Sequence, residues 1–229
     1  MIPVLISAER IAARVAELGR DIASAFPPGE LMAVCVLKGS FMFYADLVRA
    51  IPRDMTCEFL TARSYGDATV SSGVVEIGSD LAAPVAGKHV LLVEDIVDTG
   101  LTLKYLLGIL SARGPASLKS AALLSKPSRR QVEAPVDFIG FEIPDRFIVG
   151  YGLDAAQKHR NLPYLAAMDD GRGEERVPSP WPDDGHDSEA MRKLVEERDA
   201  LAASGGPPER IEKLNREIGA LAELRRLCK

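Results

Sequence analysis

The chain has 229 residues, of which 47% are hydrophobic and 27% are charged, and its formal net charge is −5. This composition is that of a globular protein with room for one α/β domain and a full core. The negative charge argues against a general nucleic-acid binder, and no apolar run approaches the roughly 20 residues that cross a membrane.

The cysteines and the N-terminus predict a cytoplasmic protein. The chain has 3 cysteines at wide spacing, which fit neither a zinc site nor a disulfide framework. Cys35 and Cys57 lie in apolar runs, so we expect both thiols to be buried. The first residues lack the length and the basic charge of a signal peptide, and unpaired thiols are typical of a reducing compartment.

The first elements are a helix and a strand–helix unit. Ser7 can cap a helix whose apolar residues keep helical spacing up to Ile22. The apolar run 31–37 predicts a buried strand, which leads through Lys38-Gly39-Ser40 into a helix over 41–50. A cation and a glycine at such a junction suit an anion, although most lysines simply lie on the surface.

A second pair of strands, over 55–62 and 74–77, flanks a run of mostly small or polar residues. Composition alone predicts a plain hairpin tip for residues 63–73. A loop of this length can also be a lid over a site.

The most informative stretch begins with the apolar run 90–93, which predicts a strand buried on both faces. Glu94 and Asp95 follow where we expect this strand to end, and the polar loop 98–102 then leads into a helix over 103–110. Strand ends in open α/β sheets bind ligands, and a helix N-terminus there holds phosphate through its unpaired N–H groups. The carboxylates suit sugar hydroxyls or a divalent metal, so the stretch fits a phosphorylated sugar.

This stretch also admits two other interpretations. It could be the magnesium-binding strand of a P-loop NTPase, but the chain lacks the Gly-x-x-x-x-Gly-Lys-Ser/Thr loop which that class requires. It could also be a solvated turn in which two acids occur by chance.

Further strand ends follow. The strand predicted over 118–124 ends near Lys126, for which a solvated turn lysine is an equal alternative from sequence alone. Short strands are predicted over 136–141 and 147–149, where Phe147 would be ordinary core by composition. Residues 150–155 fit a dinucleotide-binding glycine pattern, but no following strand carries the acid that this pattern needs.

The C-terminal quarter differs in composition. Residues 169–187 are rich in Asp, Gly, Glu and Pro and predict a linker. Residues 188–229 predict a helical hairpin, because apolar residues keep helical spacing on both sides of Gly205-Gly206-Pro207-Pro208. Residues 169–229 hold 11 Lys or Arg against 15 Asp or Glu, a net −4. Such a tail can pack on its own domain or contact another subunit or partner.

Several of these stretches resemble one family. Glu94 to Thr102 resembles the signature of the type I phosphoribosyltransferases, the hypoxanthine-guanine branch in particular. Leu37-Lys38-Gly39 is similar to that branch's pyrophosphate loop, where the peptide before the lysine can be cis, and Ser64-Tyr65-Gly66 to its closing loop. The resemblance covers residues 1–168. It implies an α/β fold in which helices flank a mostly parallel, twisted sheet with a small hood.

The resemblance also implies an activity. This is transfer of the 5-phosphoribosyl group from phosphoribosyl pyrophosphate to hypoxanthine, and to guanine, giving IMP or GMP and pyrophosphate in purine salvage. It implies Mg²⁺ as the cofactor and a homodimer or homotetramer. We expect no nucleic-acid or membrane partner.

The roles that the resemblance implies fall on residues at the predicted strand ends. The group that would bind phosphoribosyl pyrophosphate is Lys38, Gly39, Glu94, Asp95, Thr99, Gly100, Leu101, Thr102 and Arg160. The purine would meet Lys126, Phe147 and Ile148, with Asp98 as the acid-base residue. Metal would bind Glu94, Asp95 and Asp154, and the lid loop would carry Ser64 and Tyr65.

Two other functions are compatible with the sequence. One is a non-catalytic regulator that senses phosphoribosyl pyrophosphate, which the acidic tail and the lack of an N-terminal DNA-binding extension disfavour. The other is a phosphoribosyltransferase for another base, such as xanthine, uracil or a 7-deazapurine-like ring. By the same resemblance, Lys126 would face a 6-oxo group and Phe147 would stack on the ring, which favours a 6-oxopurine.

Overall fold

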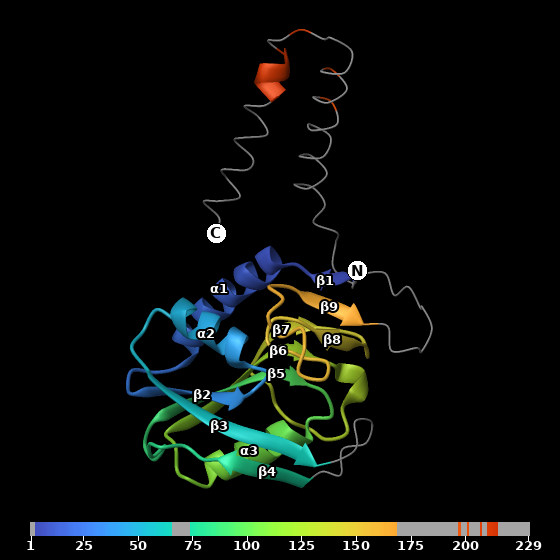
Figure 1. The fold of residues 1–229 in the computed structure, drawn as a ribbon. Coiled ribbons are helices and arrows are strands. Elements are labelled where there is room, and N and C mark those ends of the chain that lie inside the picture. Colours follow the sequence, from blue (N-terminus) through green and yellow to red (C-terminus); the bar gives the residue numbers. More distant parts are fainter. Residues whose placement is uncertain are drawn as a thin grey trace. The chain divides into compact units, whose positions relative to one another are not determined.

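The computed structural model describes residues 3–65, 74–168, 197, 201, 207 and 210–214. The chain divides into two compact units, residues 1–173 and residues 174–229. In the first unit the elements are, in chain order (Figure 1), β1 (Val4–Ile6), α1 (Ala8–Ala25), β2 (Leu31–Leu37), α2 (Phe41–Ala50), β3 (Thr56–Tyr65), β4 (Val74–Ser79), β5 (His89–Val97), α3 (Leu101–Ser111), β6 (Ser117–Ser125), the 3₁₀ turn η1 (Pro127–Arg129), β7 (Phe138–Glu142), β8 (Phe147–Val149) and β9 (Leu165–Met168).

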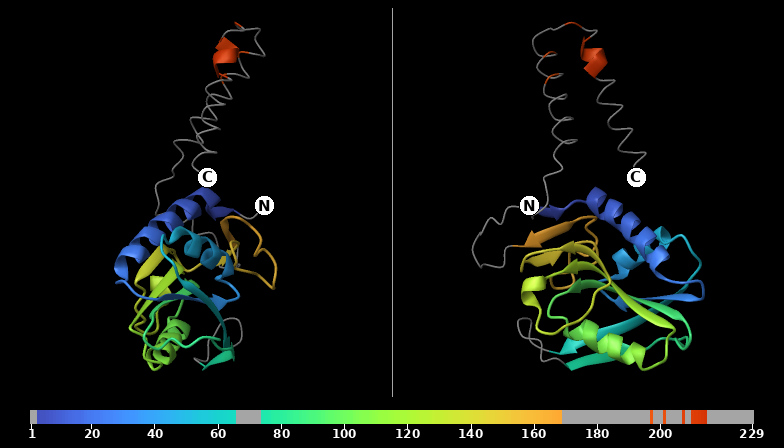
Figure 2. Two further views of the ribbon diagram at one scale, coloured as in Figure 1. Left: turned by 90° about the vertical axis from the view of Figure 1, so that its left-hand side faces the viewer. Right: turned by 180° about the vertical axis from the view of Figure 1, so that it is seen from behind.

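Six strands form one sheet in the order β4-β3-β2-β5-β6-β7. The neighbours β2–β3, β2–β5, β5–β6 and β6–β7 are parallel, and the edge strand β4 runs antiparallel to β3. Helices α1 and α2 cover one face of this sheet and α3 covers the other, as Figure 1 and Figure 2 show from three directions. The predicted α/β fold with a mostly parallel sheet between helices is confirmed.

Apolar burial explains why β2 and β5 lie in the middle of the sheet. Both strands pair on two sides, and their apolar runs are buried on both faces. On the α3 side, Val34 and Leu92 pack with Leu60, Leu103 and Leu106 in one core cluster. Each such side chain contributes about 1.5–3 kcal/mol through burial.

The remaining strands, β1, β9 and β8, form a small antiparallel sheet in that order. This sheet is the predicted hood, and Phe147 begins its strand β8. The sequence analysis did not predict β1 and β9, because strands of 3 and 4 residues are too short to show a clear alternation.

The order of strands reverses between β2 and β5. From β2 the chain crosses through α2 to β3 on one side, and from β5 it crosses through α3 to β6 on the other. The segments that leave the carboxyl ends of β2 and β5 therefore diverge. In open α/β sheets this is where ligands bind.

Some boundaries differ from the predictions. β5 continues to Val97 because β6 pairs with it up to Ser125, so Glu94 and Asp95 lie inside the strand rather than after it. β3 extends to Tyr65 through pairing with β4, so Ser64 and Tyr65 belong to a strand instead of the predicted loop. Residues 66–73 lie outside the described residues.

The prediction of two buried thiols is half right. Cys35 is buried in β2, and burial raises the pKa of its thiol to about 12. Cys57 is exposed, as is Phe59 two residues further along the same face of β3. Helix α2 packs on β2 and β5, which leaves this face of β3 less covered.

In the second unit, residues 210–214 are helical and Leu214 is buried. The guanidinium of Arg210 pairs with the carboxylate of Glu197 at 2.7 Å. The predicted linker, most of the predicted helical hairpin and Cys228 lie outside the described residues. In the part of the chain that the structure describes, no helix has the length and apolar character to cross a membrane.

Candidate active site

The segment after β2 lies against the acidic residues of β5. The peptide bond between Leu37 and Lys38 is cis. A Cβ atom built on Gly39 would lie 1.5 Å from Asp95 Oδ2, so any side chain at position 39 would collide with this carboxylate. Buried Ser40, the N-cap residue of α2, donates its hydroxyl to the carbonyl of Val36. Lys38 and Asp95, 57 positions apart in the sequence, thus belong to one site.

Two carboxyl groups occupy the middle of this site. Glu94 is 6% exposed, and its Oε1 has no hydrogen-bond partner among the described residues. Burial, and to a lesser extent the charge of Asp95, raise the pKa of Glu94 well above its ordinary value. Burial also raises the pKa of Asp95, although its Oδ1 accepts a hydrogen bond from the Ile96 amide at 2.8 Å. An unsatisfied buried carboxyl is costly, so this arrangement indicates a place for a ligand.

The predicted phosphate loop curves from β5 into α3. Gly100 is the N-cap of α3 with φ 85°, a conformation that favours glycine, and it offers no side-chain cap to the first amides of the helix. Thr99 Oγ1 accepts from the Leu101 amide at 3.4 Å. The segment after β6 supports the loop, because the Gln131 amide donates to the Thr99 carbonyl at 3.0 Å. The first turn of α3 is therefore suited to an anion.

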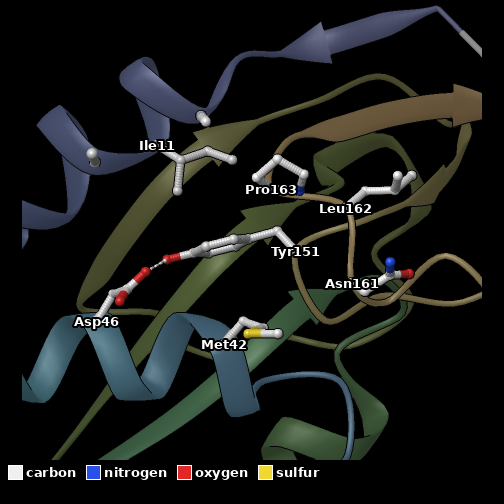
Figure 3. Close-up of a pocket in the computed structure, with 9 residues that line it drawn as sticks. Ile11, Met42, Asp46, Tyr151, Asn161, Leu162 and Pro163 are labelled. Atoms are coloured by element: carbon white, nitrogen blue, oxygen red, sulfur yellow. Dashed lines mark hydrogen bonds between the residues drawn. The ribbon is translucent and has the colours of Figure 1, made fainter. Parts of the chain in front are cut away.

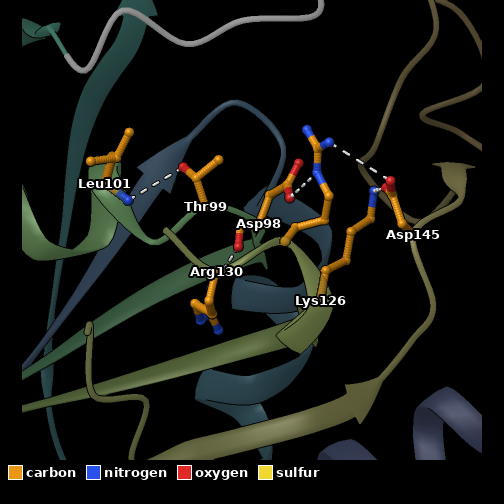
Figure 4. Close-up of polar contacts among 7 residues, drawn as sticks. Asp98, Thr99, Leu101, Lys126, Arg130 and Asp145 are labelled. Carbon is orange, nitrogen blue, oxygen red and sulfur yellow. Dashed lines mark hydrogen bonds and ion pairs between the residues drawn. The ribbon is translucent and has the colours of Figure 1, made fainter. Parts of the chain in front are cut away.

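Four charged side chains beside this loop form a network of ion pairs, shown in Figure 4. Lys126, which is 7% exposed, places Nζ 3.4 Å from Asp145 Oδ1. Arg129 lies with Nη1 3.7 Å from Asp145 Oδ2 and donates from Nε to Asp98 Oδ1 at 3.1 Å. Next to Arg129, Arg130 donates to the backbone carbonyl of Asp98 at 3.0 Å.

Arg129, Arg130 and Asp145 were not predicted from the sequence as site residues. The available signal was the pair of arginines that follows the strand-end lysine at close spacing. Their ion pairs to Asp98 and Asp145 join segments far apart in the chain, which no local pattern reveals.

The hood contributes an aromatic ring. Phe147 is 44% exposed at the start of β8, whereas Ile148 is buried and pairs with Ala167 of β9. The structure excludes the ordinary-core interpretation of Phe147. An exposed ring at this position is available for stacking on a flat ligand.

The segment after β8 carries the last two predicted site residues. Arg160 pairs through Nη2 with Asp154 Oδ1 at 2.6 Å and donates from Nη1 to the Gly152 carbonyl at 2.6 Å. The charges of both side chains act on the pKa of Asp95, Arg160 lowering it and Asp154 raising it. A Cβ atom on Gly152 would lie 2.1 Å from the Gly39 carbonyl oxygen. This segment therefore contacts the segment after β2.

A hydrogen bond fastens the same segment to α2 (Figure 3). The Tyr151 hydroxyl donates to Asp46 Oδ2 at 2.5 Å, and burial raises the pKa of Tyr151, so the hydroxyl keeps its proton at neutral pH. The two residues help to line a cavity of about 330 Å³ together with Ala8, Ile11, Ala12, Met42, Asn161, Leu162 and Pro163.

The glycine pattern at residues 150–155 is not a dinucleotide-binding turn. Gly150 and Gly152 have φ of 100° and 101° in an irregular segment that continues into β9. The residues between them and β9 form no helix whose N-terminus could hold a pyrophosphate. The rejection of this pattern is confirmed.

The donor set fits Mg²⁺ held jointly with a substrate. Within the described ranges there is no group of three or more His, Cys, Asp or Glu that could hold a metal ion. Glu94 and Asp95 nevertheless offer two carboxylates, one of them with an unpartnered buried oxygen. Mg²⁺ in phosphate-handling sites commonly takes one or two carboxylates and completes its shell with water and substrate oxygens.

Comparison with known proteins agrees with this geometry. The family model described as a phosphoribosyl transferase domain matches residues 5–156. The hypoxanthine phosphoribosyltransferase of Haemophilus influenzae is 51% identical over 170 residues, covering 73% of this chain and 95% of that protein. The Escherichia coli enzyme of the same name is 48% identical over 169 residues, covering 73% and 95%.

Solved structures show the same relationship. The hypoxanthine-guanine phosphoribosyltransferase of Bacillus anthracis is 45% identical with a TM-score of 0.71, covering 74% of this chain and 100% of that one. The Staphylococcus aureus hypoxanthine phosphoribosyltransferase is 39% identical with a TM-score of 0.70, covering 73% and 91%. This chain belongs to the phosphoribosyltransferase family and has the type I fold of that family.

Proposed function

We propose that the chain is a hypoxanthine phosphoribosyltransferase of purine salvage, which also accepts guanine. It transfers the 5-phosphoribosyl group from phosphoribosyl pyrophosphate to the base and releases pyrophosphate. The observation that carries the proposal is the acidic pair of buried Glu94 and half-buried Asp95, close before the N-terminus of α3, whose N-cap residue Gly100 has no side chain to cap the helix. The relatives named for this activity, matched over nearly their whole length, support it.

The sugar phosphate would bind at the end of β5. Backbone N–H groups of residues 99–102 and the hydroxyls of Thr99 and Thr102 would hold the 5-phosphate. Glu94 and Asp95 would accept hydrogen bonds from the ribose hydroxyls. Because the acidic pair and the helix N-terminus belong to one strand–loop–helix unit, the sugar is oriented by a single rigid element.

Departure of pyrophosphate leaves positive charge on the sugar carbon and negative charge on the leaving group. Lys38, the backbone at Gly39 and Arg160 would stabilise the leaving group, and the carboxylates would stabilise the sugar. Arg160 would exchange part of its contact with Asp154 for this purpose. Mg²⁺ held by Glu94 and Asp95, and a second Mg²⁺ held by Asp154, would neutralise the charge of the diphosphate.

The purine would lie between the hood and the network of ion pairs. Phe147 would stack on the ring, Lys126 would donate to the 6-oxo group, and the backbone of Ile148 would meet the ring edge. When N9 attacks the sugar, the proton on N7 must leave, and Asp98 would accept it. Because the Lys126 ammonium is a donor, it favours a 6-oxopurine, whose 6-oxo group accepts, over adenine, whose 6-amino group is itself a donor.

The surroundings of the site complete the proposal. Ser64 and Tyr65 at the end of β3 would carry a lid that keeps water from the reacting sugar. The enzyme would be cytoplasmic, and it would assemble as a homodimer or homotetramer. Residues 1–168 would form the catalytic domain, residues 169–187 a linker and residues 188–229 a helical extension.

The test is to mix the purified full chain with Mg²⁺, phosphoribosyl pyrophosphate and, in turn, hypoxanthine, guanine, xanthine, adenine and uracil. Formation of IMP and GMP with an equal amount of pyrophosphate is the expected result. If nucleotide forms only with xanthine or only with uracil, that base, and not hypoxanthine, is the substrate. Tight binding of phosphoribosyl pyrophosphate without nucleotide from any base would favour the non-catalytic regulator.

A further inference from the structure

The ion-pair network Lys126–Asp145–Arg129–Asp98 contains two residues, Asp145 and Arg129, that have no role in the proposed reaction. Asp145, between β7 and β8, holds one cation at each carboxylate oxygen, Lys126 at 3.4 Å and Arg129 at 3.7 Å. Arg129, in η1, lies between two anions, Asp145 and Asp98. Asp145 thus links Lys126 to Arg129, and Arg129 links Asp145 to Asp98 (Figure 4). Lys126 and Asp98, at the two ends, are the residues that would touch the purine.

Strand register brings the two ends of this network together. Val97 of β5 is paired with Ser125 of β6, and the Lys126 amide donates to the Val97 carbonyl at 3.0 Å. Asp98 and Lys126 are therefore the first residues beyond the same rung of the sheet. Register fixes their backbones, but both side chains can still rotate, the long Lys126 side chain far more than that of Asp98, and ordering them costs conformational entropy.

The ion pairs restrict those rotamers. The Lys126 side chain is only 9% exposed, and a buried ammonium needs an anion or acceptors, which Asp145 supplies. Arg129 donates to one oxygen of Asp98, Oδ1, and this contact favours the rotamers of Asp98 that keep that oxygen beside the guanidinium. Arg129 and Arg130, both in the segment after β6, contact Asp98, the first at its carboxylate and the second at its backbone carbonyl, and Asp145 after β7 is linked to Asp98 through Arg129.

A purine makes such positioning useful. The 6-oxo group and N7 lie side by side on one edge of the ring, and both must be met at once by Lys126 and Asp98. We propose that Arg129 and Asp145 are positioning residues of the purine subsite, which fix the separation of the Lys126 ammonium and the Asp98 carboxylate to match this edge. The inference rests on the proposed function.

Stability alone does not account for these ion pairs. The side chains of Arg129 and Asp98 are both 38% exposed, and ion pairs with that much solvent add little to the free energy of unfolding. Removal of Arg129 should therefore leave the melting temperature almost unchanged and act on purine binding and turnover.

The experiment compares Arg129→Gln, Arg129→Lys, Asp145→Asn and the double variant Arg129→Gln/Asp145→Asn in the full chain. We expect Arg129→Gln and Asp145→Asn each to lower kcat/KM for hypoxanthine by about tenfold, with KM for phosphoribosyl pyrophosphate within about twofold of wild type. Arg129→Lys should recover part of the loss. In the double variant kcat/KM should fall by less than the product of the two single fold-changes, because either substitution alone already breaks the ion-pair network.

Unsubstituted purine, which lacks the 6-oxo group, separates positioning from general damage. Used as a competitive inhibitor, it should bind wild type and Asp145→Asn alike, because it makes no contact with Lys126. The matched control is Arg113→Gln, which breaks an exposed ion pair with Asp80 at 2.7 Å between segments that the site does not use. This variant should keep wild-type kinetics.

Unchanged kcat/KM for hypoxanthine in Arg129→Gln would overturn the inference. Equal losses for hypoxanthine, phosphoribosyl pyrophosphate and unsubstituted purine would overturn it too, since they would indicate a structural role. If Asp145→Asn fails to fold, the two Arg129 variants decide the matter. A wild-type chain that forms no nucleotide from hypoxanthine would contradict the proposed function itself.

Discussion

At the scale of single residues, the site contains a carboxyl group in an unfavourable environment. Burial raises the pKa of Glu94 well above the ordinary 4.5 that it has in the unfolded chain. As pH rises above that value, the unfolded chain loses this proton while the folded protein retains it. The free energy of unfolding of the ligand-free protein therefore falls with pH, until pH passes the raised pKa of the folded state.

The variant Glu94→Gln cannot titrate and should escape this loss. We expect its melting temperature without ligand to match wild type near pH 4.5 and to exceed it at pH 8 by roughly 2–4 °C, corresponding to about 1 kcal/mol. Differential scanning calorimetry across this pH range measures the difference. The exposed Asp21→Asn, on α1, is the control and should show no such trend.

The same variant should lose ligand binding. In wild type, phosphoribosyl pyrophosphate with Mg²⁺ at about 100 times its Kd should add about 2.7 kcal/mol to the free energy of unfolding. Glu94→Gln should gain far less. A variant that is no more stable than wild type at pH 8, and that gains as much from ligand, would show that Glu94 is an ordinary core residue.

Asp98 provides a separate residue-scale prediction. Asp98→Asn keeps the size of the side chain and can still meet Arg129, but it cannot accept the purine proton. Turnover should fall by about two orders of magnitude while phosphoribosyl pyrophosphate still binds. Single-turnover kinetics and calorimetric titration separate the two quantities. Unchanged turnover would limit Asp98 to orienting the base.

The site residues that could be predicted from the sequence are those whose place next to an apolar run can be recognised locally. Glu94, Asp95, Lys38 and Lys126 stand at or next to the ends of apolar runs, and a strand end is a local feature. The pairing of Arg129 with Asp98 spans 31 positions and depends on where η1 turns back on the loop. No pattern along the chain records that distance, so this contact could not be predicted.

At the scale of elements, three segments meet through glycines. Gly39 allows the segment after β2 to touch Asp95, and Gly152 allows the segment after β8 to touch the Gly39 carbonyl. A side chain at either position would push these segments apart. The geometry of the proposed pyrophosphate site therefore depends on backbone contacts as much as on charged side chains.

Gly39→Ala tests this dependence. The new methyl group would overlap with the Asp95 carboxylate, so we expect KM for phosphoribosyl pyrophosphate to rise by at least about tenfold. The control is Gly108→Ala in α3, where an added Cβ meets nothing within 4 Å. Because alanine favours a helix by about 1 kcal/mol over glycine, this control should be slightly more stable with unchanged kinetics. A Gly39→Ala protein with wild-type KM would contradict the close contact.

The buried elements were the most predictable ones. The bounds expected for β2 and α2 agree with the structure, since a continuous apolar run and a helical apolar period each constrain many residues at once. The end of β5 was wrong because pairing with β6 continues beyond the apolar run. Whether a strand continues through polar residues depends on its neighbour, which the sequence of one strand does not contain.

At the scale of the whole molecule, the chain has a C-terminal segment that lies beyond its match to the H. influenzae and E. coli relatives. The H. influenzae and E. coli enzymes are each matched over 95% of their length by about three quarters of this chain. The predicted site residues all lie at or before Arg160, within the first compact unit. The second unit, residues 174–229, is thus an addition to a domain of the family's usual size.

Deleting residues 174–229 should leave kcat and both KM values within about twofold of wild type, because all residues proposed to touch substrate remain. The assay is steady-state kinetics, with light scattering to give the mass in solution for both proteins. Unchanged kinetics with fewer subunits in the assembly would assign the second unit to contact between subunits, and unchanged kinetics with the same number of subunits would leave it for another partner. A truncated protein that melts cooperatively but forms no IMP would show instead that the second unit takes part in the site.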